Sequence, residues 1–157
     1  DDRRRAHRAL HVGIVIDEHR NRFERGDFLV RNLVGADQTT GAVAIGDIVQ
    51  EGQTVQFHLR DAKSASEDLH LLLAADRSRH PNAPLGALVF SCCGRGQGLF
   101  GRPHHDSGVL TERLGQIPVA GFFAQGEIGP VGGRNFLHGY TASMALFAQP
   151  SSKAGMQ

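Results

Sequence analysis

The N-terminal third of the chain carries short apolar stretches separated by polar turns, a pattern typical of β-strands. Residues 54–60 alternate strictly between apolar and polar side chains, as a half-buried strand does. The polar, glycine-bounded segment 35–41 is typical of a turn and predicts a hairpin between the strands on either side of it. The predicted strands of this region are residues 10–16, 28–34, 42–45 and 54–60.

A change to helical spacing follows residue 61. Between residues 62 and 77 the apolar side chains recur every three or four positions, which predicts an amphipathic helix with Asp61 as its N-cap. Pro81 and Pro84 end it. The apolar positions that define the pattern are Ala65, Leu69, Leu72 and Leu73.

The continuous apolar run at residues 86–92 predicts a central strand covered on both faces. A helix beginning at Asp106 or Ser107 and ending near residue 114 leads to a second buried strand at 119–124, which favours a parallel βαβ crossover. After a glycine-rich loop, one last strand is expected at 136–147. The predicted fold class is therefore α+β, a mixed and largely antiparallel sheet with a βαβ crossover and helices packed on it.

Composition narrows the class of protein. The 157 residues are 40% hydrophobic and 21% charged, with a net charge of +1, so there is no electrostatic case for binding nucleic acid. No apolar run is long enough to span a bilayer, which predicts no membrane partner. The adjacent pair Cys92 and Cys93 excludes a disulfide scaffold and suits a reducing cytoplasm. We predict a basic linker at 1–9, one domain at 10–148 and a disordered tail at 149–157.

The segment Ser91-Cys92-Cys93-Gly94-Arg95-Gly96 follows the predicted central strand. Ligands of α/β folds bind just beyond such strand ends, so Cys92 and Arg95 are candidate binding residues. A thiol beside Arg95 could also be reactive, whereas a cysteine that serves as a small apolar residue is the alternative.

The segment from Gly126 to Asn135 places two charged side chains and an amide among four glycines. An arginine can clamp a carboxylate and a glutamate can hold an ammonium group, so Glu127, Arg134 and Asn135 match the two charged ends of an amino acid. The alternative is a Glu127–Arg134 ion pair that only fixes the loop.

Three further polar side chains accompany the early strands. Arg31 shares a strand face with leucines and therefore needs a partner or a cavity. Together with Asn32 and Arg60 it is a candidate ligand contact. The run His104-His105-Asp106 does not have the spacing of a metal site, and Asp106 is expected to cap the second helix. No metal and no cofactor are predicted.

Four motifs resemble the FIST C-domain, in order along residues 11–147. They are Gly26-Asp27-Phe28-Leu29-Val30-Arg31, Phe57-His58-Leu59-Arg60-Asp61, Phe90-Ser91-Cys92-Cys93-Gly94-Arg95-Gly96 and residues 121–139. The resemblance implies a small-ligand sensory module of signal transduction, with amino acids as proposed ligands, and no catalysis. It also implies a preceding FIST N-domain or a signalling partner, so the chain is expected to be a fragment of a longer protein. Cys93 departs from the pattern, which carries a polar residue, often asparagine, at this position.

Two other functions remain open from the sequence. One is a cysteine-dependent enzyme that uses Cys92 or Cys93 with Arg95 and His104. The other is a protein-docking module without a small ligand, whose sign would be a large exposed apolar patch. Without its N-domain the chain could also form a homodimer.

Overall fold

The computed structural model describes residues 9–149, and the chain divides into two compact units. Within the described residues, the first unit comprises 9–61 and 128–139 and the second comprises 62–127 and 140–149. The predicted linker 1–9 and tail 149–157 fall outside the described residues except for Ala9 and Gln149.

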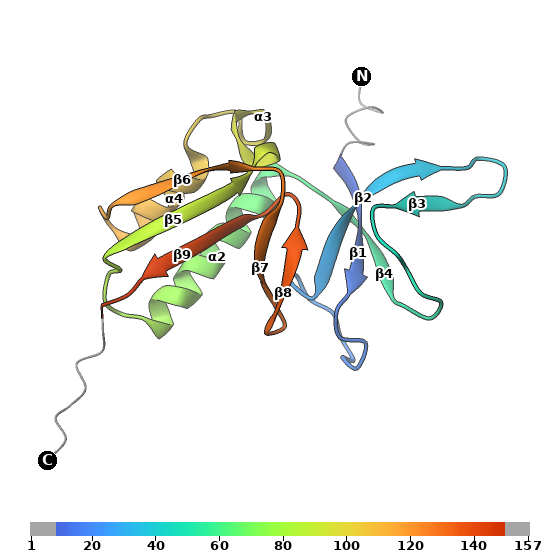
Figure 1. Ribbon diagram of the computed structural model, residues 1–157, viewed down its shortest axis with the longest axis horizontal. Helices are drawn as coiled ribbons and strands as arrows, with labels where there is room; N and C mark the ends of the chain where they lie inside the picture. The colour runs from blue at the N-terminus through green and yellow to red at the C-terminus, as the bar shows by residue number, and fades with distance from the viewer. Residues whose placement is uncertain (1–8, 150–157) are drawn as a thin grey trace, which may run out of the picture. The chain divides into compact units, whose positions relative to one another are not determined.

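The first unit is built on a four-stranded antiparallel sheet in the order β3-β2-β1-β4 (Figure 1). Its strands are β1 (Leu10–Val15), β2 (Phe28–Ala36), β3 (Val43–Ile45) and β4 (Val55–Leu59), close to the predicted positions. The hairpin between β2 and β3 is confirmed. β1 pairs with β2 on one edge and β4 on the other, and it is the most buried strand of this sheet.

A second hairpin in this part of the chain corrects the prediction of a loop. β7 (Glu127–Val131) pairs with β8 (Arg134–His138), and two glycines form the turn between these strands. Gly132 and Gly133 both have positive φ, 56° and 78°, which is the conformation that a two-residue hairpin turn requires. The glycine density that suggested a loop is thus concentrated in a turn between strands.

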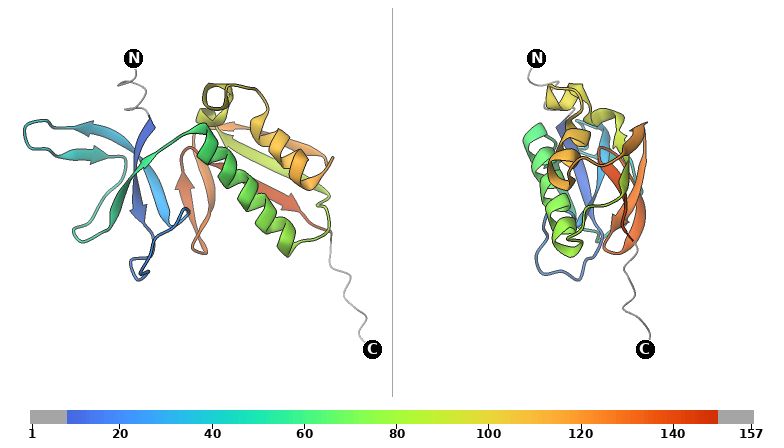
Figure 2. Two further views of the ribbon diagram at one scale, coloured as in Figure 1. Left: turned by 180° about the vertical axis from the view of Figure 1, so that it is seen from behind. Right: turned by 90° about the vertical axis from the view of Figure 1, so that its left-hand side faces the viewer.

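The second unit is a three-stranded mixed sheet with two helices on one face. β5 (Gly86–Cys92) pairs in parallel with β6 (Val119–Ala124) and in antiparallel with β9 (Ala142–Phe147). The helices α2 (Ala62–Arg79) and α4 (His105–Leu114) lie on the same side of this sheet (Figure 2). A 3-10 turn, η1 (Cys93–Arg95), and the short α3 (Gln97–Phe100) connect β5 to α4.

The parallel βαβ crossover and the α+β class are confirmed, with two corrections. The strands belong to three sheets instead of a single one. The predicted last strand at 136–147 is two strands, β8 and β9, separated by a bend at Tyr140, whose φ is 66°. A left-handed non-glycine residue cannot continue a strand, so the chain leaves one sheet and enters another.

The core of the second unit forms where the two helices meet the sheet. Its buried members are Leu69 and Leu73 of α2, Ala87 and Val89 of β5, and Val109, Leu110 and Leu114 of α4. Leu72, counted in the helical pattern, is 67% exposed.

β5 is central as predicted, but it is not covered on both faces. Its odd-numbered residues Ala87 and Val89 face the helices, whereas Leu88 and Phe90 are only half-buried on the opposite face. β6, predicted to be buried, is an exposed edge strand: Phe122 is 65% and Phe123 60% exposed. An apolar run therefore indicated a strand correctly, but not its burial.

Candidate functional site

The parallel strands β5 and β6 end at the same edge of the sheet. Cys92 lies opposite Ala124 in their register, so the segments that follow both strands begin side by side. Edges of this kind bind ligands in open α/β sheets, because the loops there present backbone amides and side chains together. Glu127 follows β6 by three residues and is the first charged side chain beyond it.

The carboxylate of Glu127 is held beside Thr141. Glu127 is only 2% exposed, and its Oε2 accepts hydrogen bonds from the Thr141 hydroxyl at 3.2 Å and from the Thr141 amide at 3.4 Å. Thr141 in turn accepts a hydrogen bond on its carbonyl from the amide of Cys92, at 2.9 Å. The carboxylate is thereby anchored to the end of β5.

The second oxygen of the same carboxylate, Oε1, is buried and has no hydrogen-bond partner among the described residues. A buried polar atom without a partner costs roughly 1–3 kcal/mol, more when the group is charged. The preceding residues Gln125 and Gly126 are exposed. Oε1 can accept a hydrogen bond from an ammonium, amide or hydroxyl donor that reaches it.

Arg95, predicted to line the same site, is instead part of a buried ion pair. Its Nε and Nη2 donate to the two carboxylate oxygens of Asp106, each at 2.8 Å, and both side chains are 7% exposed. Ser91 donates a further hydrogen bond to Asp106 at 2.9 Å. The guanidinium also lies 5.3 Å from the ring centre of Phe100. These contacts join η1, α3, β5 and α4.

The ion pair with Arg95 also sets the pKa of the Asp106 carboxyl group. Burial alone would raise the pKa of the carboxyl group, but the hydrogen bonds and charge of Arg95 outweigh it, and the pKa lies below its ordinary value. The prediction that Asp106 caps the helix is wrong: His104 occupies the N-cap, with a φ of 57°, and Asp106 lies within the first turn of α4. Arg95 of η1 and Ser91 of β5, and not the helix end, hold its carboxylate in place.

His105 extends the same network. Its Nδ1 lies 3.0 Å from Asp106 and its Nε2 3.0 Å from the hydroxyl of Ser66, while its ring stacks on Phe100 at 3.5 Å. The connectivity Ser66–His105–Asp106 is that of a catalytic triad. However, Arg95 neutralises the carboxylate whose charge would have to stabilise a histidinium ion, and His105 is only 6% exposed. The arrangement is that of a packed internal network.

The remaining predicted residues lie in the first unit. Arg31 donates hydrogen bonds to Asp47 at 2.6 Å and to the carbonyls of Val30 and Leu137 at 3.2 Å. An arginine on an apolar strand face was expected to need a partner, and these three acceptors provide it. Arg134 is exposed and lies 5.7 Å from the ring centre of Phe136. Asn32 and Asn135 are exposed, and Arg60 is half-buried.

The eight predicted residues are therefore divided between the units. Arg31, Asn32, Arg60, Arg134 and Asn135 belong to the first unit, and Cys92, Arg95 and Glu127 to the second. Within the second unit the structure connects Cys92 to Glu127 through Thr141, which the sequence did not single out. Cys92 is buried and Cys93 exposed, and both thiols are free.

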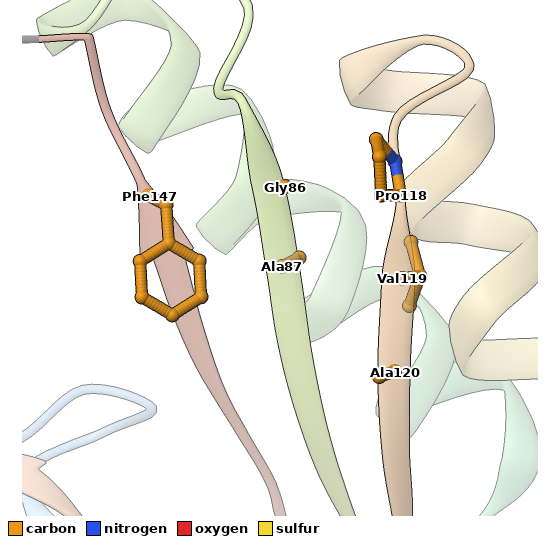
Figure 3. A pocket seen from close by; sticks show the side chains of 6 residues that line it. All are labelled: Gly86, Ala87, Pro118, Val119, Ala120 and Phe147. Carbon is orange, nitrogen blue, oxygen red and sulfur yellow. The ribbon is translucent and has the colours of Figure 1, made fainter.

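A shallow pocket of about 280 Å³ lies at the other end of the same sheet (Figure 3). It is lined by Gly86, Ala87, Pro118, Val119, Ala120 and Phe147. None of the eight predicted residues lines it, and none of its side chains carries a hydrogen-bonding group. The pocket can therefore contact an apolar group, but it has no side chain that could bind a charged one.

Within residues 9–149, no cluster of three or more histidine, cysteine or acidic side chains is arranged to hold a metal ion. None of the helices described is both long and apolar enough to cross a membrane.

Two partly or fully buried histidines face each other in the first unit. His11 and His58 are register partners on β1 and β4, and His58 packs edge-on against Phe28 at 4.7 Å. Burial is the main cause that lowers the pKa of both histidines. For His11, a hydrogen bond to the Ala9 carbonyl raises the pKa in part, and the charge of Arg60 lowers it further. For His58, the neighbouring His11 lowers the pKa further. A Cβ on Gly13 would collide with the His58 ring, so the glycine makes room for it.

We expect stability to fall as the pH drops below about 6.5, where unfolded histidine begins to bind protons while the folded pKa values remain lower. Each histidine contributes at most about 1.4 kcal/mol per pH unit in this window. Thermal unfolding at stepped pH values measures the effect, and His58→Phe should reduce the slope. His19→Gln, at an exposed position, is the control. An unchanged slope in His58→Phe would contradict the assignment.

The fold and this edge of the sheet define a small α+β domain with a buried carboxylate and no metal-binding cluster among the described residues. Residues 1–130 match the FIST C domain, and the chain belongs to this family of sensory domains.

The relatives are longer proteins. The chain is 52% identical over 147 residues to the uncharacterised protein Rv0628c of Mycobacterium tuberculosis and 51% identical to the uncharacterised protein Mb0898c of Mycobacterium bovis. Each match covers 94% of this chain but only 38% of the relative. A third relative, the F-box/LRR-repeat protein At5g63520 of Arabidopsis thaliana, is 31% identical over 105 residues, which cover 64% of this chain and 20% of that protein. The chain thus spans well under half the length of the mycobacterial proteins it matches.

Proposed function

We propose that the chain is a sensory module of a signal-transduction protein that binds a small molecule carrying an ammonium group, an amino acid being the leading class, without catalysing a reaction. Membership of a sensory family supports the module. The observation that carries the ligand class is the buried Oε1 of Glu127, which has no partner among the described residues.

Charge explains why an ammonium group is the preferred partner. A carboxylate that keeps one oxygen unpaired inside a protein is stabilised most by a cationic donor, because charge-assisted hydrogen bonds are about twice as strong as neutral ones. Thr141 already holds the other oxygen in place. Oε1 therefore has a fixed direction before the ligand arrives, which lowers the entropic cost of binding.

The rest of the ligand would lie against the segments that follow β5 and β6. The Cys92 amide is used by Thr141, and Arg95 by Asp106, so neither is available to a ligand in this arrangement. Arg134 and Asn135, which the sequence also suggested, are exposed on β8 of the first unit, and the proposal does not depend on them. Cytoplasmic signalling, with a FIST N-domain or another protein as the partner, is part of the same proposal.

A thermal-shift screen tests the ligand class. Free amino acids should raise the melting temperature of the native chain, whereas their N-acetyl derivatives, which lack the ammonium group, should not. At a concentration of about 100 times Kd, one site adds about 2.7 kcal/mol to the free energy of unfolding. Glu127→Gln should abolish the shift while the unliganded variant remains folded.

Glu112→Gln, on an exposed position of α4, is the matched control and should respond like the native chain. Equal shifts with N-acetyl derivatives, or an unaltered response in Glu127→Gln, would remove Glu127 from the site. No shift with any amino acid would count against small-molecule binding by this chain.

A further inference from the structure

The face of the β6–β5–β9 sheet opposite the helices is largely apolar, with Ser143 as its polar member opposite Phe90, and it is open within the second unit. Alternation along β5 directs Leu88 and Phe90 to this face, and their register partners Ala120 and Phe122 lie on it from β6. Phe90 and Phe122 contact each other edge to face at 5.1 Å. Phe147 adds a third aromatic ring from β9, opposite Gly86.

Large side chains on this face are more exposed than a sheet surface normally leaves them. Phe122 is 65% and Phe147 52% exposed, and no residue of β5, β6 or β9 is charged. Sheets discourage unwanted association by placing charges on such strands, and especially on edge strands. β6 is an edge strand and lacks this protection.

The same face carries both a knob and a hollow. The shallow pocket surrounds Gly86 and lies between Phe147 on one side and Pro118 on the other (Figure 3). Phe122 projects from β6 two residues beyond Ala120, which lines the pocket. At about 280 Å³ the hollow has room for a phenyl ring.

We infer that this face is a homodimer interface, in which Phe122 of each copy enters the Gly86 hollow of the other. A two-fold interface uses one patch twice and therefore requires a surface that is complementary to itself. A knob and a hollow on one uncharged sheet face meet this requirement. Two twisted sheets stacked face to face about 10 Å apart would bury both patches.

The area that this face offers places the dimer among the small, weak interfaces. With 150–250 Å² per phenylalanine, the exposed rings and the smaller side chains around them provide roughly 400–500 Å² per copy. The total for two copies is roughly 800–1,000 Å², at the lower limit of about 1,000 Å² expected of a specific interface. We therefore expect a reversible dimer with a dissociation constant in the micromolar range, independent of the ligand proposed above.

Sedimentation velocity of the 157-residue chain across roughly 1–100 µM should show a monomer–dimer equilibrium, since a micromolar constant is resolved in that range. Phe122→Glu should shift the midpoint more than tenfold toward monomer. Ala120→Arg, which places a charge in the hollow without removing an aromatic ring, should do the same. Circular dichroism confirms that both variants remain folded.

Ile48→Glu is the control, because Ile48 is 88% exposed in the first unit, and it should dimerise like the native chain. A native chain that stays monomeric throughout the range would overturn the inference and leave another protein segment as the occupant of this face. A dimer that survives both Phe122→Glu and Ala120→Arg would place the interface elsewhere and overturn it as well.

Discussion

Replacing Asp106 with alanine should lower the free energy of unfolding by about 3–5 kcal/mol, because it leaves the Arg95 guanidinium buried without a counter-charge. Arg95 is 7% exposed and directs two donors at this one carboxylate. Ser91 and His105 would lose their common partner at the same time. A typical domain has only about 5–15 kcal/mol of total stability, so the variant should be close to unfolding at physiological temperature.

Urea denaturation of native and variant chains measures this loss directly. The double variant Arg95→Met/Asp106→Leu removes both charges, so no unpaired charge remains buried. It should therefore lower the free energy of unfolding far less than Asp106→Ala alone. Lys63, which forms an exposed 3.9 Å pair with Glu67 on α2, provides the surface comparison. Lys63→Ala should cost no more than about 1 kcal/mol. Similar losses in Lys63→Ala and Asp106→Ala would show that the burial of the pair is unimportant.

Leu110→Ala should cost about 2–5 kcal/mol through the cavity it creates between α4, α2 and the sheet. Leu110 is fully buried, at 0% exposure, in the core that includes Leu69, Leu73 and Val89. The backbone around this position is fixed by helix α4, so the surroundings can relax only partly.

Leu72→Ala is the matched control, because it is the same chemical change on α2 at 67% exposure. It should alter the free energy of unfolding by about 0.5 kcal/mol or less. A large loss in Leu72→Ala would mean that this face of α2 is covered in solution, whereas a small loss in Leu110→Ala would contradict the core described above.

Substitutions at Asp106 and at Leu110 disturb the second unit in different ways, so comparing them separates the effect of the ion pair from that of the core. Asp106 and Leu110 are one helical turn apart on α4, so they contact the same sheet. Asp106 fixes the segments that follow β5, whereas Leu110 fixes the helix against the strands. If the ligand site lies at the end of β5 and β6, a folded Asp106→Asn variant should lose binding more readily than a Leu110→Val variant of equal stability.

Local sequence was sufficient for most elements because their signals do not depend on distant residues. Alternation identified β4, helical spacing identified α2, and the apolar run at 86–92 identified β5. The βαβ crossover followed from the order of two apolar strands and a helix between them. The two-residue turn at Gly132-Gly133 was also a local signal, but it was read as part of a loop because other glycines surround it.

The site was predicted less well, for a physical reason. Residue types indicated that arginines among apolar residues need partners, but they did not indicate which partner. For Arg95 it is Asp106, eleven residues away, and for Arg31 it is Asp47 together with two backbone carbonyls. Such pairs form only when the fold brings two elements together, so a candidate ligand contact and a structural ion pair look alike in sequence.

By itself, then, the sequence determined the fold class, the family resemblance and the order of the strands and helices, since each rests on short-range periodicity or on motifs. Only the tertiary structure decided which apolar strands are covered, where the chain leaves one sheet for another, and that Thr141 anchors the carboxylate of Glu127 while its Oε1 has no partner among residues 9–149. Burial and hydrogen-bond partnership are properties of pairs of segments distant along the chain. They are fixed when those segments pack, and no local pattern encodes them.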